Sequence, residues 1–220
     1  LLTPEVKLLA IVHISNSLGT INPVREMCAK AKAIGATTFV DAAQSAGHIP
    51  VSVQDIGCDF LAFSGHKVCA PTGIGVLYGR MAILENMPPW HGGGEMILTV
   101  TLDTCTYKPP PARFEAGTPD IAGAIGLAAA IDYLEAIGLQ NIEQHGLELA
   151  QHALNRLSTI EGLRILGPQT GPRGSLVSFH CDFAHPHDIV EWANTYGIAM
   201  CGGHHCTQQL MKRLKVHGSN

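Results

Sequence analysis

Short apolar runs alternate with polar, glycine-containing stretches over the first 80 residues, and this pattern predicts a mixed α/β fold. Leu8–Ile14 is a near-continuous apolar run, which is typical of a strand buried on both faces. Asn22 is a good N-cap, Pro23 suits the first helical position, and Gly35 suits a helix end, so we expect a helix between them. Three further apolar runs predict more strands of a mainly parallel sheet: Thr37–Val40, Asp59–Phe63 and Ile74–Tyr78.

The pattern changes after these strands. Glu85–Thr118 is rich in proline and glycine and is typical of a solvated loop region. Ile121–Ile137 predicts a long apolar helix and Leu139–Leu157 an amphipathic one. The last elements expected are strands at Leu163–Leu166, Ser175–Cys181 and Ile198–Met200 and a helix at Pro186–Tyr196. That order indicates a small α+β domain, so we place a domain boundary near Ala130.

A lysine and an aspartate each follow one of the predicted strands. Asp41 follows the second strand and Lys67 the third, at the ends where parallel α/β sheets bind ligands. A lysine in apolar surroundings is readily neutral and can form a Schiff base with an aldehyde. A carboxylate beside it suits pyridoxal phosphate, because it keeps the pyridine nitrogen protonated. The alternatives are a surface lysine and a Schiff-base aldolase that uses no cofactor, in which Asp41 would have no pyridine partner.

A second candidate site is the loop Gly202–Cys206. Its two glycines make the loop mobile, and a cysteine in such a loop can be exposed and reactive. Cys201, His204, His205 and Cys206 also have metal-ligand chemistry. Ligands packed so closely in sequence do not easily surround a tetrahedral ion, so we expect no metal. The other alternative is that the cysteine in this loop is an inert thiol.

Composition narrows the classes of function. The net charge of −4 argues against nucleic acid as the main partner. No apolar stretch approaches the ~20 residues that cross a bilayer, so no membrane partner is expected. No glycine-rich dinucleotide fingerprint follows a predicted strand, which argues against a nicotinamide enzyme. Seven cysteines, an odd number, indicate free thiols in a reducing compartment. Five of them are expected in or beside packed elements: Cys28, Cys58, Cys69, Cys105 and Cys181.

Six stretches share both the sequence and the order of one family. They are Val40–Gln44, Asp59–Phe60, Phe63–Lys67, Pro71–Gly75, Pro88–Gly94 and Phe114–Pro119. Together they resemble the SufS-type cysteine desulfurases and selenocysteine lyases of the class V aminotransferase superfamily, from about Leu8 to about Met211. The resemblance implies the fold type I of pyridoxal-phosphate-dependent transferases. Residues 1–130 would be a partial cofactor-binding large domain and residues 131–220 a partial small domain.

The resemblance also implies roles for individual residues. Lys67 would hold pyridoxal phosphate as a Schiff base and move the proton at the substrate α-carbon, and Asp41 would pair with the pyridine nitrogen. Cys206 would take sulfur from L-cysteine, leaving L-alanine and an enzyme persulfide. The other cofactor contacts would be Asn16 and Gln44 at the phenolic oxygen, Ser64 and His66 at the phosphate, and Thr118 at the phosphate of the other subunit of a homodimer.

The implied protein is a cytoplasmic cysteine desulfurase, or one of an organelle stroma or matrix, that passes sulfur to an acceptor protein for iron–sulfur cluster assembly. A selenocysteine lyase acting on L-selenocysteine is the alternative within the superfamily. The chain departs from the family at Cys201, where an arginine is usual. A ring-stacking histidine, a phosphate-capping threonine and a substrate-binding arginine would fall outside the sequence. We therefore expect a fragment; if it is the whole molecule, it should bind cofactor weakly and turn over little or not at all.

Overall fold

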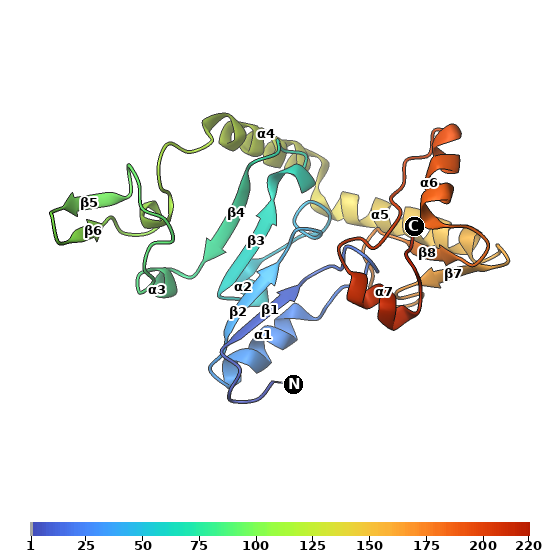
Figure 1. Ribbon diagram of the computed structural model, residues 1–220, viewed down its shortest axis with the longest axis horizontal. Coiled ribbons are helices and arrows are strands. Elements are labelled where there is room, and N and C mark those ends of the chain that lie inside the picture. Colours follow the sequence, from blue (N-terminus) through green and yellow to red (C-terminus); the bar gives the residue numbers. More distant parts are fainter. Residues whose placement is uncertain (1) are drawn as a thin grey trace. The chain divides into compact units, whose positions relative to one another are not determined.

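The computed structural model describes residues 2–220, and the chain divides into two compact units (Figure 1). The first unit takes in Leu1–Val12, Pro23–Gly47 and Val51–Ala136, and the second His13–Asn22, His48–Pro50 and Ile137–Asn220. The sequence positions of the candidate site are therefore shared between the units. The domain boundary expected near Ala130 stays a prediction.

A four-stranded sheet forms the centre of the first unit, in the order β1-β2-β3-β4 (Figure 1). The strands are β1 (Leu8–Val12), β2 (Thr37–Asp41), β3 (Phe60–Ser64) and β4 (Gly75–Gly79). β1, β2 and β3 are parallel, as predicted, whereas β4 runs antiparallel to β3. The prediction of a further parallel strand there is wrong because a parallel crossover needs a dozen or more residues, and the connection from Ser64 to Gly75 is shorter.

Helix α1 covers the core of this sheet. It spans Val24–Ala33, one residue later than predicted, because Pro23 and not Asn22 occupies the N-cap position. Gly35 adopts the left-handed conformation that ends a helix, with φ of 78°, as predicted. The buried core contains Val24, Cys28, Val40, Ala42, Ile56, Cys58 and Leu61. The other helices of the unit are α2 (Val53–Ile56), α3 (Met81–Leu84) and α4 (Ile121–Ile137), with single 3₁₀ turns at Gly65–Lys67 and Ala112–Phe114.

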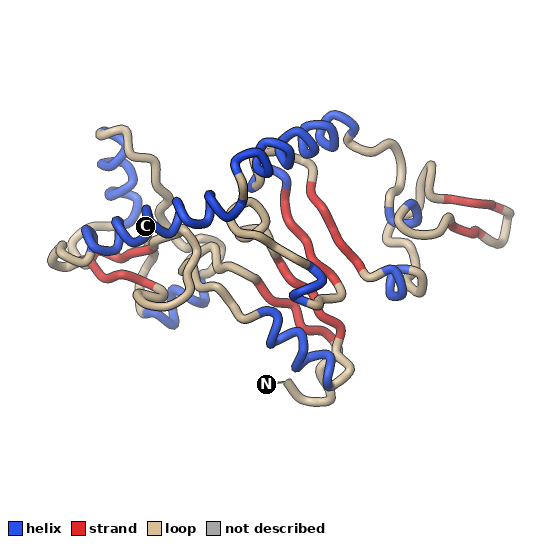
Figure 2. The backbone as a smooth tube through the Cα atoms, turned by 180° about the vertical axis from the view of Figure 1, so that it is seen from behind, coloured by secondary structure: helices blue, strands red, loops and turns tan. Residues whose placement is uncertain are grey.

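The segment predicted as loop contains a β-hairpin. Strands β5 (Ile97–Val100) and β6 (Cys105–Tyr107) pair antiparallel, and the Thr101 N–H donates to the Thr104 carbonyl over 2.8 Å to close the turn. Figure 2 shows the hairpin extending away from the four-stranded sheet. The signal for a strand lay in the run of branched residues from 97 to 101, which the flanking prolines and glycines obscured.

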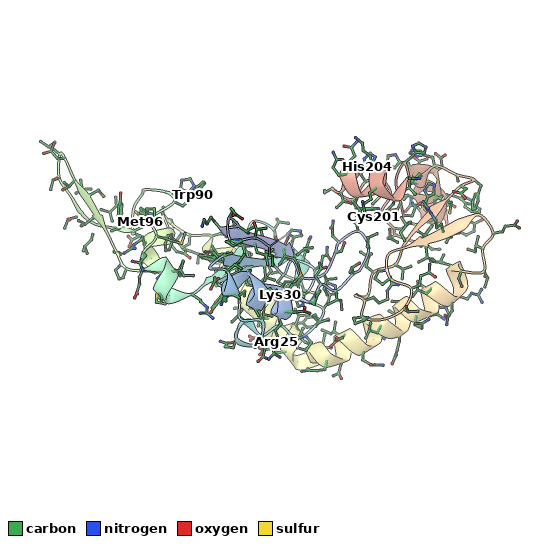
Figure 3. The ribbon with its side chains drawn as sticks, turned by 90° about the horizontal axis from the view of Figure 1, so that it is seen from below. Arg25, Lys30, Trp90, Met96, Cys201 and His204 are labelled. Carbon is green, nitrogen blue, oxygen red and sulfur yellow. The ribbon has the colours of Figure 1, made fainter. Side chains whose placement is uncertain are left out.

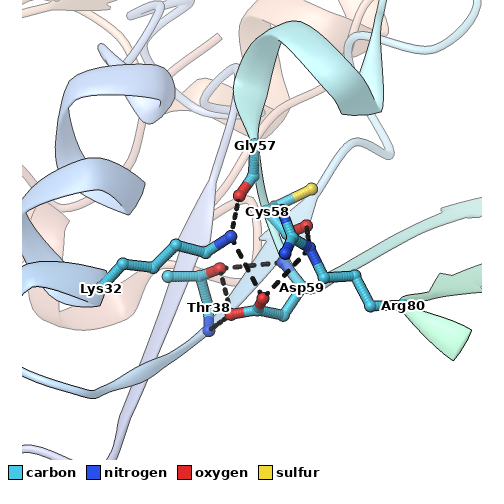
Figure 4. A network of polar contacts seen from close by, with 6 residues as sticks. All are labelled: Lys32, Thr38, Gly57, Cys58, Asp59 and Arg80. Carbon is cyan, nitrogen blue, oxygen red and sulfur yellow. Dashed lines mark hydrogen bonds and ion pairs between the residues drawn. The ribbon is translucent and has the colours of Figure 1, made fainter. Parts of the chain in front are cut away.

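A buried carboxylate joins α1 to the sheet (Figure 4). Asp59 accepts hydrogen bonds from the N–H and hydroxyl of Thr38 at 2.9 and 2.8 Å. The Lys32 Nζ and Arg80 Nε atoms lie 3.2 and 3.4 Å from the other carboxylate oxygen. Burial raises the pKa of Asp59, but the hydrogen bonds from Thr38 and the ammonium of Lys32 outweigh burial and hold the pKa below its ordinary value.

Asp59→Asn is expected to lower the free energy of unfolding by about 2 kcal/mol at neutral pH, because it leaves buried donors without a charged acceptor. Since the folded-state pKa of Asp59 is depressed, this stabilisation is complete above the unfolded value of about 3.9 and is lost as pH falls through the folded value. Urea unfolding of both proteins across pH measures the difference. Asp132→Asn, on the exposed face of α4, is the control and should change little. A difference in unfolding free energy between Asp59→Asn and the wild type that persists unchanged at low pH would refute a stabilising role of the ionised Asp59 carboxylate.

The second unit has a two-stranded antiparallel sheet flanked by helices. Its elements are α5 (Leu139–Leu157), β7 (Leu163–Leu166), β8 (Ser178–Cys181), α6 (Pro186–Thr195) and α7 (Gln208–Leu214). The predicted bounds of α4, α5 and β7 are confirmed, and β8 is shorter than predicted. Residues 198–200 form no strand, so that prediction is wrong, and α7 was not predicted. Within residues 2–220, no single helix is long and apolar enough to cross a membrane; α4 and α5 have that length and hydropathy only together, as a bent pair.

Candidate active site

The turn that carries Lys67 follows directly after β3. Gly65–Lys67 forms a 3₁₀ turn, closed by a hydrogen bond of 2.9 Å from the Val68 N–H to the Gly65 carbonyl. The neighbouring parallel strand β2 ends at Asp41, whose Cα pairs with that of Ala62 on β3. Both side chains therefore lie at the carboxyl edge of the sheet, where α/β folds bind ligands.

Two other segments support the Lys67 turn. A Cβ on Gly47 would lie 3.0 Å from the Lys67 carbonyl oxygen, so the segment that follows Gln44 packs directly on the turn. On α4, a Cβ at Gly126 would lie 2.7 Å from Pro71 Cγ, so this helix approaches the loop after Lys67 closely. The two glycines thus let the segment after β2 and helix α4 pack against the loop that contains Lys67 and Pro71.

Several polar side chains at the carboxyl edge of the sheet have donors or acceptors that are not used within the chain. Asp41 Oδ1 accepts the Ala43 N–H over 2.9 Å, which orients an otherwise exposed carboxylate. Within the described residues 2–220, the side chains of four others form no hydrogen bond or ion pair: Gln44, Ser64, His66 and Lys67. Gln44, Ser64 and Lys67 are half-buried. An amine, a carboxylate, a hydroxyl and an imidazole free to bind a ligand fit the aldehyde, pyridine nitrogen and phosphate of pyridoxal phosphate.

Gly65→Ala is expected to distort this turn. A Cβ at Gly65 would lie 2.7 Å from Ile74 Cγ2 and 2.8 Å from the Ile74 carbonyl oxygen, and backbone cannot move aside cheaply. We expect the free energy of unfolding to fall by about 1–3 kcal/mol and uptake of pyridoxal phosphate to fall with it. Gly92→Ala is the matched control, because a Cβ there meets no atom within 4 Å. Equal unfolding midpoints and cofactor titrations for the two variants would contradict the expectation.

Cys206 lies at the tip of a tight turn in the second unit. The Thr207 N–H donates to the His204 carbonyl over 2.8 Å, and His205 and Cys206 between them have φ of 50° and 60°. Positive φ at both central residues is the signature of a type I′ turn, which usually contains Asn or Gly. For other L-residues this conformation costs roughly 1–2 kcal/mol each. The Cys206 side chain is exposed at this strained turn.

Backbone and side-chain contacts hold the Cys206 turn at both ends. Gly203 pairs with Ser219 through two hydrogen bonds of 3.0 Å, and His205 Nε2 donates to the Ser219 carbonyl over 2.9 Å. On the other side, Asn16 Nδ2 donates to the His205 carbonyl over 2.9 Å. Sequence reasoning placed Asn16 at the cofactor and missed this contact. Cys201 and His204 lie in the same loop (Figure 3).

The cysteines differ in burial: three are buried, Cys105 is half-buried, and three are exposed. Burial raises the pKa of the Cys28, Cys58 and Cys181 thiols, as expected of packed residues. Cys69 is exposed, with φ of 64°, so the prediction that it packs is wrong; it follows a turn and faces outward. Among the described residues, no group of three or more His, Cys, Asp or Glu side chains is arranged to hold a metal ion.

The predicted site residues occupy separate parts of the chain. Lys67 lies in the first unit with Asp41, Gln44, Ser64, His66 and the exposed Thr118, and Cys206 lies in the second unit with Asn16. The structure thus brings the Lys67 group to one sheet edge and brings Asn16 to the Cys206 turn. The cofactor and catalytic roles of these residues stay predictions.

Comparison with known proteins gives consistent matches over the full chain. A family model described as Aminotransferase class-V matches residues 1–220. A probable cysteine desulfurase of Halalkalibacterium halodurans is 55% identical over 215 residues, which are 98% of this chain and 52% of that protein.

Solved structures agree with the sequence matches. The cysteine desulfurase CsdA from Escherichia coli superposes with a TM-score of 0.94 at 40% identity, covering 99% of this chain and 54% of that one. The apo cysteine desulfurase of Thermococcus onnurineus also gives a TM-score of 0.94, at 45% identity, over 97% of this chain and 54% of that one. These likenesses confirm the α/β fold that the resemblance implied. The chain spans about half the length of the relatives that it matches.

Proposed function

The chain belongs to the class-V aminotransferase family, and from that premise we propose that the protein is a pyridoxal-phosphate-dependent cysteine desulfurase. It converts L-cysteine to L-alanine and leaves the sulfur as a persulfide on the protein. The placement of Asp41 at the end of β2 and of Lys67 just after β3, its parallel neighbour, carries the proposal. The relatives named as cysteine desulfurases support it.

Lys67 and Asp41 have different roles at the carboxyl edge of the sheet. Bound pyridoxal phosphate supplies an electron-accepting ring, and Asp41 keeps the ring nitrogen protonated. Lys67 holds the cofactor through its amine and then takes and returns the proton at the substrate α-carbon. Ser64 and His66 bind the phosphate oxygens, and Gln44 donates to the phenolic oxygen side of the ring.

Cys206 performs the sulfur transfer. Its thiolate attacks the sulfur of the substrate, so that a sulfur–sulfur bond forms as the carbon–sulfur bond of L-cysteine breaks. The bonding electrons pass to the substrate carbon, which takes up a proton and leaves as L-alanine. Cys206 then carries one additional sulfur atom. An exposed thiol at the tip of a turn suits both the attack and the later transfer to an acceptor.

The wider biology follows from the same assignment. The persulfide passes to an acceptor protein that supplies iron–sulfur cluster assembly. The enzyme acts as a homodimer, in which the exposed Thr118 of one subunit reaches the phosphate in the other. Residues 1–130 form part of the cofactor-binding domain and residues 131–220 part of the small domain. Its free thiols suit the cytoplasm.

Alanine release from L-cysteine tests the proposal. The protein with pyridoxal phosphate should form L-alanine in a reaction that needs both cofactor and protein, with L-selenocysteine run in parallel to decide the preferred substrate. Cofactor with an unrelated protein gives the background rate. Alanine at the background rate would contradict the function, and a much higher kcat/KM for L-selenocysteine would make the protein a selenocysteine lyase.

A further inference from the structure

We propose that Asn16 and Ser17 are positioning residues that hold the Cys206 turn in its left-handed conformation. The proposal rests on the sulfur-accepting role proposed for Cys206, and it concerns contacts within the second unit alone. The hydrogen bonds from Asn16 and Ser17 to the turn together form a latch.

The latch contacts the chain on both sides of Cys206. Asn16 Nδ2 donates to the carbonyl of His205, the residue before the cysteine, over 2.9 Å. The Ser17 and Thr207 hydroxyl oxygens lie 2.8 Å apart, and Thr207 follows the cysteine. Either hydroxyl can donate in this pair; Thr207 Oγ1 also lies 2.9 Å from the His204 carbonyl, and when it donates its hydrogen there it accepts from Ser17. Ser17 and Thr207 therefore form one chain of hydrogen bonds that ends on the turn itself.

Hydrogen bonds cross-link the segment Ser15–Gly19, which carries Asn16 and Ser17 and is the platform of the latch. The Ser17 side chain is only 1% exposed, although its hydroxyl serves an exposed loop. Ser15 Oγ accepts the N–H groups of Ser17 and Leu18 at 3.3 and 3.2 Å, and the Gly19 N–H donates to the Ser15 carbonyl over 3.0 Å. The Gly174 N–H donates to the Gly19 carbonyl over 2.8 Å and fixes the segment from outside.

A fixed platform explains how a strained turn persists without glycine. Two consecutive non-glycine residues with positive φ relax unless the surrounding contacts determine their conformation. Relaxation would change the direction of the Cys206 side chain, because the turn sets where its Cα–Cβ bond points. A nucleophile attacking a substrate sulfur depends on that direction. The latch thus keeps Cys206 oriented between turnovers.

Paired variants at Thr207 test the latch in the full chain loaded with pyridoxal phosphate. Thr207→Val removes the hydroxyl while keeping the shape, and Thr207→Ser keeps the hydroxyl. Amide hydrogen exchange of residues 204–207 should be at least about fivefold faster in the valine variant, because it loses the hydroxyl contacts to Ser17 and to the His204 carbonyl, and close to wild type in the serine variant. Thr195→Val is the matched control, because the Thr195 hydroxyl donates over 2.7 Å to Trp192 on α6, away from the turn. Exchange that is equal in the valine variant and the wild type overturns the latch.

A second readout separates positioning from mere stability. The rate of persulfide formation on Cys206 from L-cysteine should fall about tenfold in Thr207→Val and recover in Thr207→Ser. Faster exchange with an unchanged rate of persulfide formation would overturn the positioning role. If the wild type itself forms no persulfide, the proposed function fails, and the exchange measurement still decides whether the Ser17–Thr207 contact holds the turn.

Discussion

Replacing Lys67 with alanine is expected to abolish the covalent attachment of pyridoxal phosphate and to reduce alanine formation by at least about 10³-fold. The amine of Lys67 holds the cofactor and moves the proton at the substrate α-carbon, so its loss removes two functions at once. Absorbance of the cofactor band after gel filtration measures attachment. The turn at Gly65–Lys67 is held by backbone bonds, so the fold should survive the change.

Lys30→Ala is the control for Lys67→Ala. Lys30 lies on α1 and pairs with Glu26 over 2.5 Å at the surface (Figure 3), so its loss should affect neither cofactor attachment nor turnover. A Lys67→Ala protein that retains the bound cofactor band would defeat the assignment. A loss of attachment in Lys30→Ala as well would indicate that surface amines dominate the signal.

Cys206→Ser is expected to retain cofactor attachment but lose the persulfide. A hydroxyl is a far weaker nucleophile toward sulfur than a thiolate, so sulfur from L-cysteine should not remain on the protein. Sulfur-labelled L-cysteine followed by gel filtration and peptide mapping measures the transfer. Alanine formation should fall by at least about 10²-fold.

Cys201→Ser is the matched control for Cys206→Ser, because Cys201 is exposed in the same loop (Figure 3). We expect labelled sulfur on Cys206 in this variant, at the wild-type level. Labelled sulfur that still appears on Cys206→Ser would count against Cys206 as the acceptor. Label found mainly on Cys201 would move the role to that thiol.

Hydrophobic periodicity predicted the elements that depend on local sequence. The bounds of α4 and α5 follow from long apolar and amphipathic patterns, and β1, β2 and β3 follow from short apolar runs. The prediction that β1 is buried on both faces is wrong, since Leu8 is 57% exposed. The pattern predicted β4 as a strand but not its direction, because direction depends on the length of the connection. The hairpin β5–β6 was missed because the prolines and glycines on both sides of it are typical of a loop.

The candidate site was predictable to different degrees. Because ligands bind at strand ends in α/β sheets, the sequence alone sufficed to place Lys67 and Asp41 at one edge. By contrast, Asn16 and His205 are 189 positions apart, and only the folded chain brings their atoms together. The left-handed conformation of Cys206 was equally invisible, since a cysteine carries no preference for it. Local sequence patterns therefore identify candidate reactive residues, whereas the contacts that position those residues depend on the tertiary structure.

Trapping the cofactor on the wild-type protein tests the central claim most directly. The protein is incubated with pyridoxal phosphate, reduced with borohydride, digested, and mapped for the modified lysine. If Lys67 holds the cofactor as proposed, the label should lie mainly on Lys67. Adding L-cysteine before the reduction should lower the amount of label on this residue. Label scattered over surface lysines such as Lys30, or no label, would contradict a cofactor site at the end of β3.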